Sequence, residues 1–112
     1  MFDCWYGPSV LTERPAVRVK RWSNGNTSIT RVAEPVMHPH ENLVDVNYTL
    51  FVRDGFQHCE ELHETHRMRY LFRPEIEMFA GTVGFSLLES AEWITGRAPG
   101  FDTWGVYFVL AA

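Results

Sequence analysis

The sequence predicts an α+β fold in which an antiparallel meander sheet is followed by one helix and a terminal pair of antiparallel strands. Three observations lead to this prediction. Apolar and mainly polar residues alternate along 44–52, as in a strand that buries one face. Asn-Gly at 24–25 and Asp-Gly at 54–55 are typical of tight turns between such strands. After Pro74, apolar residues recur at the spacing of a helix.

The composition is that of one globular domain with a modest core. The chain has 112 residues, of which 46% are hydrophobic and 14% aromatic. Its formal net charge of -4 gives no general attraction to nucleic acid or to an anionic membrane. Arg14, Arg18, Lys20 and Arg21 form a local basic run. We interpret this run as a solvated strand face, because a phosphate-tracking surface needs more positive charge.

The cysteine content and the absence of long apolar runs indicate the cellular setting. Cys4 and Cys59 are too few for a disulfide framework. The first residues lack the pattern of a signal peptide, and no apolar run reaches the ~20 residues that span a bilayer. We therefore expect a cytoplasmic protein with no membrane partner, whose thiols are reduced.

The first half of the chain has the pattern of strands and turns. Residues 2–6 resemble the end of a strand that runs into a loop at 7–8, and we expect further strands upstream of it. A hairpin follows, whose returning strand covers 27–32. Pro35 and Pro39 are expected to end that strand and to form a connector to the next one.

The second half completes the sheet and adds the helix. A long segment at 57–71 is expected to return antiparallel to the preceding strand. A helix is predicted at 74–83, because proline is tolerated in its first turn and Gly84 is a natural C-terminal cap. A short buried strand at 85–88 and a final strand at 103–110 are expected to pair with each other.

Four residues of the segment 57–71 raise the question of a metal site. His58 and His66 would share one face of a strand, whereas Cys59 and His63 would point to the other. Zinc requires converging ligands, so no metal is expected. Cys59 with His63 as a nucleophile pair lacks any recognisable context. For His66 two interpretations stay open, a residue that lines a pocket and a hydrogen-bonded core histidine.

Three segments together resemble one enzyme family. They are 2–8, which contains Trp-Tyr-Gly-Pro, 73–85, and 95–105, which contains Gly-Arg-Ala-Pro-Gly-Phe-Asp-Thr-Trp-Gly. They resemble the C-terminal part of class I S-adenosylmethionine-dependent methyltransferases, which have a Rossmann-like fold. The nearest group is the N-methyltransferases that act on nucleotide-linked amino sugars in antibiotic biosynthesis. The resemblance covers essentially the whole chain.

This resemblance implies a division of the chain into three segments. Residues 1–15 would be a strand end and loop, 16–72 an inserted antiparallel sheet, and 73–112 the last helix and the closing strands. The Gly-x-Gly-x-Gly turn that binds the donor in this family does not occur in the sequence. S-adenosylmethionine is the cofactor of the full-length family, but we expect this chain alone to bind no cofactor and to be inactive.

The resemblance also suggests which residues bind the acceptor. A nucleotide-linked sugar, or another small-molecule acceptor, needs cationic and aromatic partners. Arg97 is the candidate for the diphosphate, because a guanidinium can bind phosphate through two hydrogen bonds. Trp5 and Tyr6 would line a wall at the carboxyl edge of the sheet, although core packing is the alternative for Trp5. His66 completes this set of predicted substrate-binding residues, and no catalytic residue is predicted.

Two other functions compete with that of a methyltransferase fragment. One is a non-catalytic oligomerisation module, in which exposed sheet edges pair with another copy of the chain. The other is an independent ligand-binding α+β domain. The first competing function is compatible with the fragment hypothesis, because a truncated enzyme would also have to cover its open edges.

Overall fold

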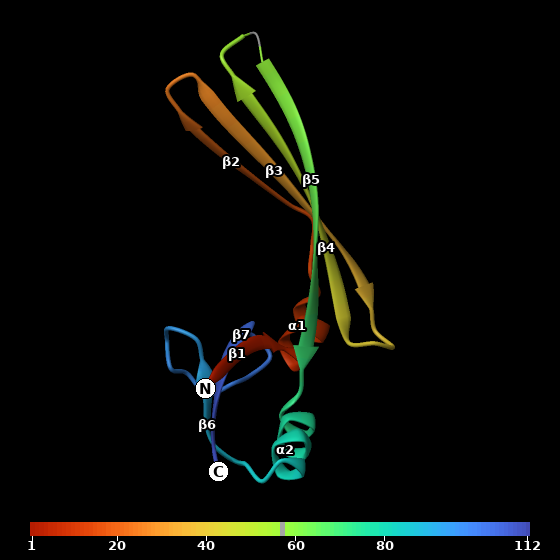
Figure 1. Ribbon diagram of the computed structural model, residues 1–112, viewed down its shortest axis with the longest axis vertical. Coiled ribbons are helices and arrows are strands. Elements are labelled where there is room, and N and C mark those ends of the chain that lie inside the picture. The colour runs from red at the N-terminus through yellow and green to blue at the C-terminus, as the bar shows by residue number, and fades with distance from the viewer. Residues whose placement is uncertain (57) are drawn as a thin grey trace. The chain divides into compact units, whose positions relative to one another are not determined.

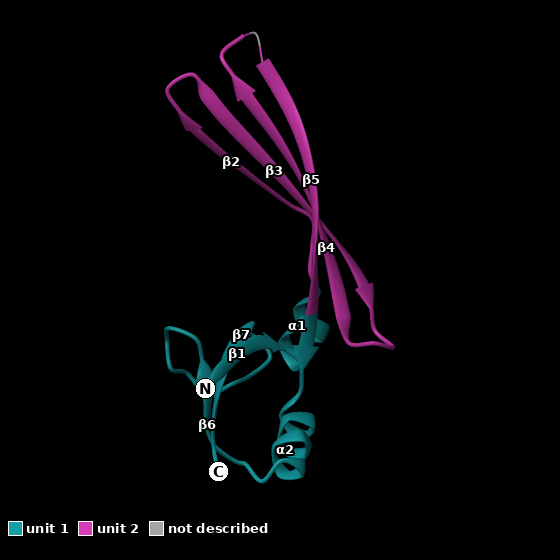
Figure 2. Ribbon diagram, in the orientation of Figure 1, with its two compact units in different colours: residues 1–14, 69–112 teal, residues 15–68 magenta. Residues whose placement is uncertain are grey.

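The computed structural model describes residues 1–56 and 58–112 (Figure 1). The strands are β1 Phe2–Tyr6, β2 Arg18–Asn24, β3 Thr27–His38, β4 Leu43–Asp54, β5 His58–Leu71, β6 Ser86–Glu92 and β7 Gly105–Ala111, and the helices are α1 Gly7–Glu13 and α2 Arg73–Thr82. The chain divides into two compact units, residues 1–14 with 69–112 and residues 15–68 (Figure 2). No helix in the described ranges is long and apolar enough to cross a membrane.

The unit of residues 15–68 is an antiparallel sheet, which agrees in part with the meander predicted for 16–72. Its strands are ordered β2-β3-β4-β5. Strand β3 pairs antiparallel with β2 and with β4, and β5 runs opposite to β4 (Figure 1). The first hairpin closes on Gly25-Asn26, because Asn24 pairs with Thr27. Gly25 has a φ of 62°, the positive value that a type II′ turn requires at its first central position. The turn therefore lies one residue beyond the predicted Asn-Gly pair.

Strand β3 is longer than the sequence predicts. It continues through Pro35 to His38, whereas the prolines were expected to end it near Val32. Strand β2 reaches only as far as Ala33 along β3, so Pro35 has a strand on one side only, where it pairs with Val46. At such an edge position the missing N–H of proline removes no ladder bond, and the strand can continue.

The two faces of strand β4 carry different kinds of side chain. Val44 and Val46 are buried on one face, as the alternation predicted. On the other face, Asp45 accepts two hydrogen bonds from Arg67 of β5, at 2.9 and 3.1 Å, and lies 2.8 Å from the Nε2 of His38 of β3. The hydrogen bonds from Arg67, followed by the one from His38, lower the pKa of Asp45 to about 2. The predicted start of β5 at Gln57 lies outside the described residues.

The other unit is a small mixed sheet covered by helix α2. Strand β1 pairs in parallel with the end of β5, through Trp5 with Tyr70, and antiparallel with β7. Strands β6 and β7 form the predicted terminal antiparallel pair. The core of this unit is built on Ile76 of α2 and on Val106 and Phe108 of β7, all of them buried.

Helix α2 forms as predicted, and a hydrogen bond to its own first turn caps its N-terminus. The backbone N–H of Phe72 donates to the side chain of Glu75 at 3.2 Å, which satisfies a group that the helix leaves free. Gly84 follows the helix with a φ of 82°. Strand β6 covers Ser86–Glu92 and so extends beyond the predicted 85–88. That predicted part is mostly exposed, so the prediction of a buried strand is wrong, and a bulge between Leu87 and Glu89 shifts the register with β7.

Helix α1 is an element that the sequence did not predict. Gly7-Pro8 was expected to form a loop, but Pro8 occupies the first turn of a seven-residue helix, where its missing N–H is harmless. The helix buries Ser9 and Val10 completely. A helix of seven residues is too short to show the apolar periodicity that predicts a helix. It is also unstable by itself in water, so tertiary packing stabilises it.

Candidate functional site

Two of the predicted substrate-binding residues lie together at the carboxyl end of β1. The ring of Trp5 meets the ring of Trp104 edge-on, with the centroids 5.5 Å apart. The backbone N–H of Tyr6 donates to the carbonyl of Trp104 at 2.8 Å. Both Trp5 and Tyr6 are half-buried, so each has part of its ring in the unit and part accessible. Trp5 and Trp104 can provide an aromatic wall for a flat ligand, while the ring of Tyr6 also packs against the core cluster of the unit.

Arg97 lies in the loop between β6 and β7, where it is paired with two carboxylates. Its Nε and Nη2 donate to Glu92 at 3.0 and 3.2 Å, and its Nη1 donates to Asp102 at 3.3 Å. These hydrogen bonds, with one from Thr95, hold the pKa of Glu92 below its usual range. Glu92 uses the bidentate edge of the guanidinium, so an incoming phosphate would have to displace the more exposed Asp102.

One buried hydroxyl joins this loop to helix α1, and a second closes the loop on itself. Ser9 donates to the carbonyl of Gly100 at 2.9 Å, and Thr103 exchanges bonds with the backbone of Gly100 at 2.8 and 3.0 Å. Both hydroxyl-bearing side chains are fully buried. No pattern in the sequence pointed to Ser9, because the segment that contains it was expected to form a loop.

Tyr70 is a further residue of this region that the sequence did not single out. It pairs with Trp5 across the parallel β1–β5 contact and is fully buried. Its hydroxyl has no hydrogen-bond partner within 1–56 and 58–112. A buried O–H without a partner costs free energy, so it is a candidate polar contact for a bound group. Apolar and polar residues do not alternate regularly along 57–71, so the sequence did not predict that Tyr70 is buried.

Cys4, on β1 beside Trp5, is not suited to act as a nucleophile. Burial, followed by the charges of Asp3 and Glu75, raises the pKa of its thiol to about 11. The thiol is therefore protonated at neutral pH, and only the thiolate is reactive.

The strand-to-helix turn after β1 does not fit S-adenosylmethionine. A donor-binding turn needs glycines whose backbone a ligand can approach. At Gly7, a Cβ would lie 2.5 Å from two ring atoms of Phe72, so the space beside the backbone is already filled. The described residues thus provide no cradle for the cofactor at this turn.

His66 lies in the other unit, on the antiparallel sheet, where it is exposed, so the interpretation as a core histidine is wrong. Its ring meets Tyr48 edge-on with the centroids 5.0 Å apart, and its Nε2 lies 2.7 Å from a carboxylate oxygen of Glu64. His63, three residues earlier, contacts Thr49 on the opposite face of the sheet. No group of three metal-ligating side chains converges within the residues that the structure describes.

Comparison with known proteins identifies the fold. No family model and no curated protein matches the chain. Among solved structures, it is similar to an S-adenosylmethionine-dependent methyltransferase from Clostridium acetobutylicum ATCC 824, with 16% identity, a TM-score of 0.73, and coverage of 97% of this chain and 42% of that one. It is also similar to the CcbJ methyltransferase from Streptomyces caelestis, with 14% identity, a TM-score of 0.68, and coverage of 98% of this chain and 44% of that one.

A third solved structure has a similar fold. CalS10 from Micromonospora echinaspora is an amino pentose methyltransferase involved in calicheamicin biosynthesis, solved with S-adenosylmethionine bound. It is 18% identical, with a TM-score of 0.63 and coverage of 85% of this chain and 36% of that one. The chain therefore spans less than half the length of these structures. At such identities the likeness establishes the fold, and it confirms the resemblance predicted from the sequence.

Proposed function

We propose, from the premise that the chain has the fold of part of an S-adenosylmethionine-dependent methyltransferase, that it is the C-terminal, acceptor-side part of a small-molecule methyltransferase. The reaction that we favour is N-methylation of a nucleotide-linked amino sugar in natural-product biosynthesis. The observation that carries the proposal is the match of 97% of the chain to 42% of an S-adenosylmethionine-dependent methyltransferase. In this proposal, residues 16–72 form the inserted sheet, between the strand end of 1–15 and the closing elements of 73–112.

The proposed acceptor site uses the residues at the end of β1. An amine acceptor needs alignment and a group or water that takes up a proton. Trp5 and Tyr6 would form the wall against the sugar or the base. Arg97 would bind the diphosphate after exchanging Asp102 for a phosphate oxygen, while Glu92 keeps the guanidinium in place. His66 lies in the other unit, and its part in binding stays a prediction.

The donor is proposed to bind outside these residues. The turn at Gly7 is closed by Phe72, and the sequence has no Gly-x-Gly-x-Gly turn. We therefore propose that the isolated chain is inactive and binds its acceptor without the donor.

Titration calorimetry of the isolated chain tests this proposal. A nucleoside diphosphate amino sugar is expected to bind, and Arg97→Ala is expected to raise its Kd by about tenfold or more, since charge-assisted hydrogen bonds are lost. Arg73→Ala is the matched control in the same unit, because Arg73 is an exposed arginine that pairs with Glu77. It should leave the Kd unchanged.

S-adenosylmethionine is titrated into the same preparation. No saturable heat is expected, and binding in the micromolar range would show that a donor site exists within the chain. Equal effects of Arg97→Ala and Arg73→Ala on the sugar nucleotide would remove Arg97 from the acceptor site.

A second function, assembly with further copies of the chain, is favoured by the two edges of the meander. In the described strand pairings β2 has only β3 as a neighbour, and residues 58–68 of β5 have only β4. The first edge is basic and the second acidic, with Arg18, Lys20 and Arg21 on β2 and Glu60, Glu61 and Glu64 on β5. Because strand direction alternates across the four strands, β2 and β5 run in opposite directions. The β2 of a second copy, placed beside β5 by translation alone, would therefore pair with it antiparallel.

Charge reversal at these edges tests the proposed homo-oligomer. Arg21→Glu and Glu61→Lys are each expected to weaken association by about tenfold or less, because like charges would then face each other across the edge. The double variant is expected to recover part of the loss. Sedimentation velocity at low and high salt measures these effects, and a monomer at every salt concentration would rule the assembly out.

A further inference from the structure

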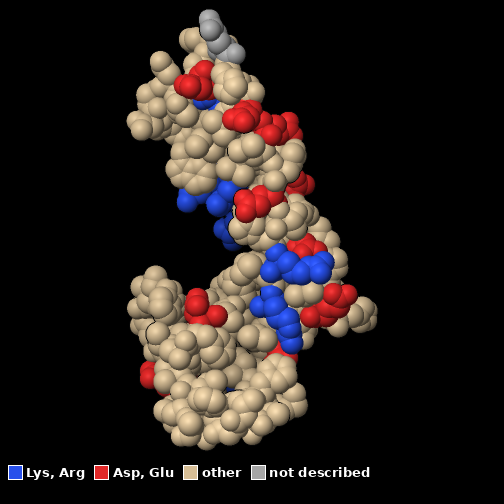
Figure 3. Space-filling view, in the orientation of Figure 1, with Lys and Arg blue, Asp and Glu red and all other residues tan. Residues whose placement is uncertain are grey.

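Two cations oppose each other on one face of the antiparallel sheet. Lys20 of β2 is the direct cross-strand partner of Arg31 of β3. Like charges in this position destabilise a sheet. None of the ion pairs formed by the described residues includes either side chain. This part of the face therefore has two neighbouring positive charges without a described counter-charge. The space-filling view shows basic side chains gathered on this unit (Figure 3).

Aromatic rings fix the guanidinium of Arg31 in place. Its central carbon lies 5.4 Å from the ring centroid of Trp22 and 5.2 Å from that of Tyr48. The ammonium of Lys20 lies 5.1 Å from the same Trp22 ring. Such cation–π contacts hold a cation in place but leave its N–H groups free to donate to a ligand.

One of these N–H groups has no acceptor. The Nε of Arg31 is buried and has no hydrogen-bond partner in the described part of the chain. A buried donor without a partner is costly, so the guanidinium is held here without its full set of acceptors. An anion on this face would offset the repulsion between Arg31 and Lys20.

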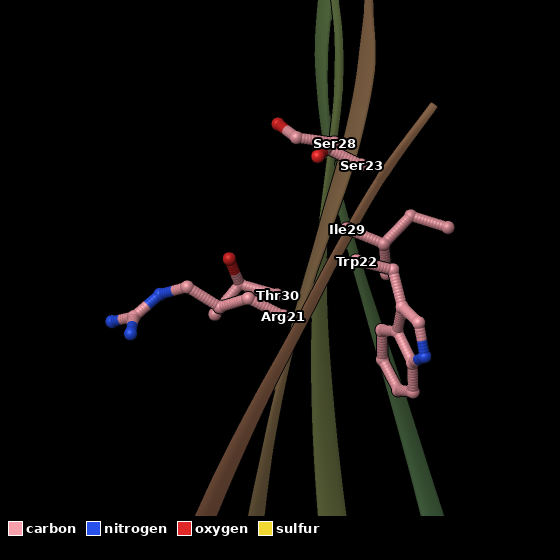
Figure 4. A pocket seen from close by; sticks show the side chains of 6 residues that line it. All are labelled: Arg21, Trp22, Ser23, Ser28, Ile29 and Thr30. Carbon is pink, nitrogen blue, oxygen red and sulfur yellow. The ribbon is translucent and has the colours of Figure 1, made fainter. Parts of the chain in front are cut away.

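The rings beside the cations offer a surface for a flat group. Trp22 is 42% exposed although it is a large apolar side chain. It projects from the opposite side of β2 to Arg21, at an open depression along the β2–β3 hairpin (Figure 4). On the other side of Arg31, Tyr48 is half-buried and its ring meets His66, which pairs with Glu64. An uncharged ring can therefore stack on Trp22 next to the cations.

We propose that Lys20, Trp22, Arg31 and Tyr48 form a binding site for small organic anions in which a phosphate or carboxylate group is joined to a flat ring. The acidic group bridges Lys20 and Arg31, and the ring stacks on Trp22. The site lies in the unit of residues 15–68, whereas Arg97 lies in the other unit, and it does not depend on the proposed methyltransferase function.

Calorimetry with three probes tests the site on the intact chain. Phenyl phosphate, benzoate and inorganic phosphate separate the contributions of the ring and of the acidic group. At least one ring-bearing anion is expected to bind with a Kd of about 0.1–1 mM. Inorganic phosphate, which lacks the ring, should bind about tenfold more weakly. Binding of phenyl phosphate alone assigns a phosphate ligand, and binding of benzoate alone assigns a carboxylate.

Substitutions then locate the binding. Arg31→Met and Lys20→Met are each expected to raise the Kd about tenfold, by removal of one cation. Arg53→Met is the control, because Arg53 pairs with Ser28 on the other face of the same sheet. The two substitutions at separate positions keep the test decisive if one variant is unstable. Binding of neither ring-bearing probe, or equal effects of Lys20→Met and Arg53→Met, would overturn the proposal. Arg97→Ala should leave this binding unchanged.

Discussion

Replacing Phe108 by alanine is expected to lower the free energy of unfolding by about 3–5 kcal/mol. Phe108 is fully buried at the centre of β7, and it packs with Val106 and Ile76. Its ring also stacks on Phe2 of β1, with the centroids 5.7 Å apart. Removing it leaves a cavity between helix and sheet that the neighbouring strands cannot fill. Because a domain is stable by only about 5–15 kcal/mol, the unit would approach its unfolding threshold.

Denaturation in guanidinium chloride, followed by tryptophan fluorescence, measures this loss. Trp5, Trp93 and Trp104 lie in the same unit as Phe108, so the signal reports mainly on it. Phe101→Ala is the matched control, because that ring is 69% exposed and should change stability by less than about 0.5 kcal/mol. A similar small change for Phe108→Ala would show that the packing described for β7 is wrong.

Replacing Gly7 by alanine is expected to destabilise the same unit by about 1–3 kcal/mol. The new Cβ would lie 2.5 Å from the ring of Phe72, a distance that van der Waals repulsion forbids. Phe72 is itself held edge-on against Tyr70, with the centroids 5.9 Å apart, so it cannot move without disturbing a buried ring. Helix α1 would shift, and with it the bond between Ser9 and Gly100.

A double-mutant cycle identifies the cause. In a Phe72→Leu background, which leaves more room, Gly7→Ala is expected to cost about 1 kcal/mol less than in the original chain. Gly81→Ala is the control, because a Cβ at Gly81 meets no atom within 4 Å and alanine favours the helix that contains it. It should be neutral or stabilise the protein. Additive effects of Gly7→Ala and Phe72→Leu would exclude the clash as the cause.

The sequence by itself determined the elements whose signals are local. The alternation of 44–52 predicted β4 because side chains on a strand face opposite sides every second residue. Turn dipeptides located the hairpins to within one residue, since few residues accept positive φ. Pro74 and Gly84 marked both ends of α2 for similar reasons. The motifs around Trp5 and Arg97 also identified the methyltransferase fold, which the solved structures confirm.

Only the tertiary structure decided the features that depend on distant partners. Helix α1 exists because Ser9 and Val10 are buried against other segments, and β3 passes Pro35 because β2 ends before it. The pairing of Arg97 with Glu92 and the stacking of Arg31 on two rings likewise depend on which strands are neighbours. A residue's own sequence context fixes its local conformation. Its burial and its partners are fixed by segments far along the chain, whose positions follow from the complete fold.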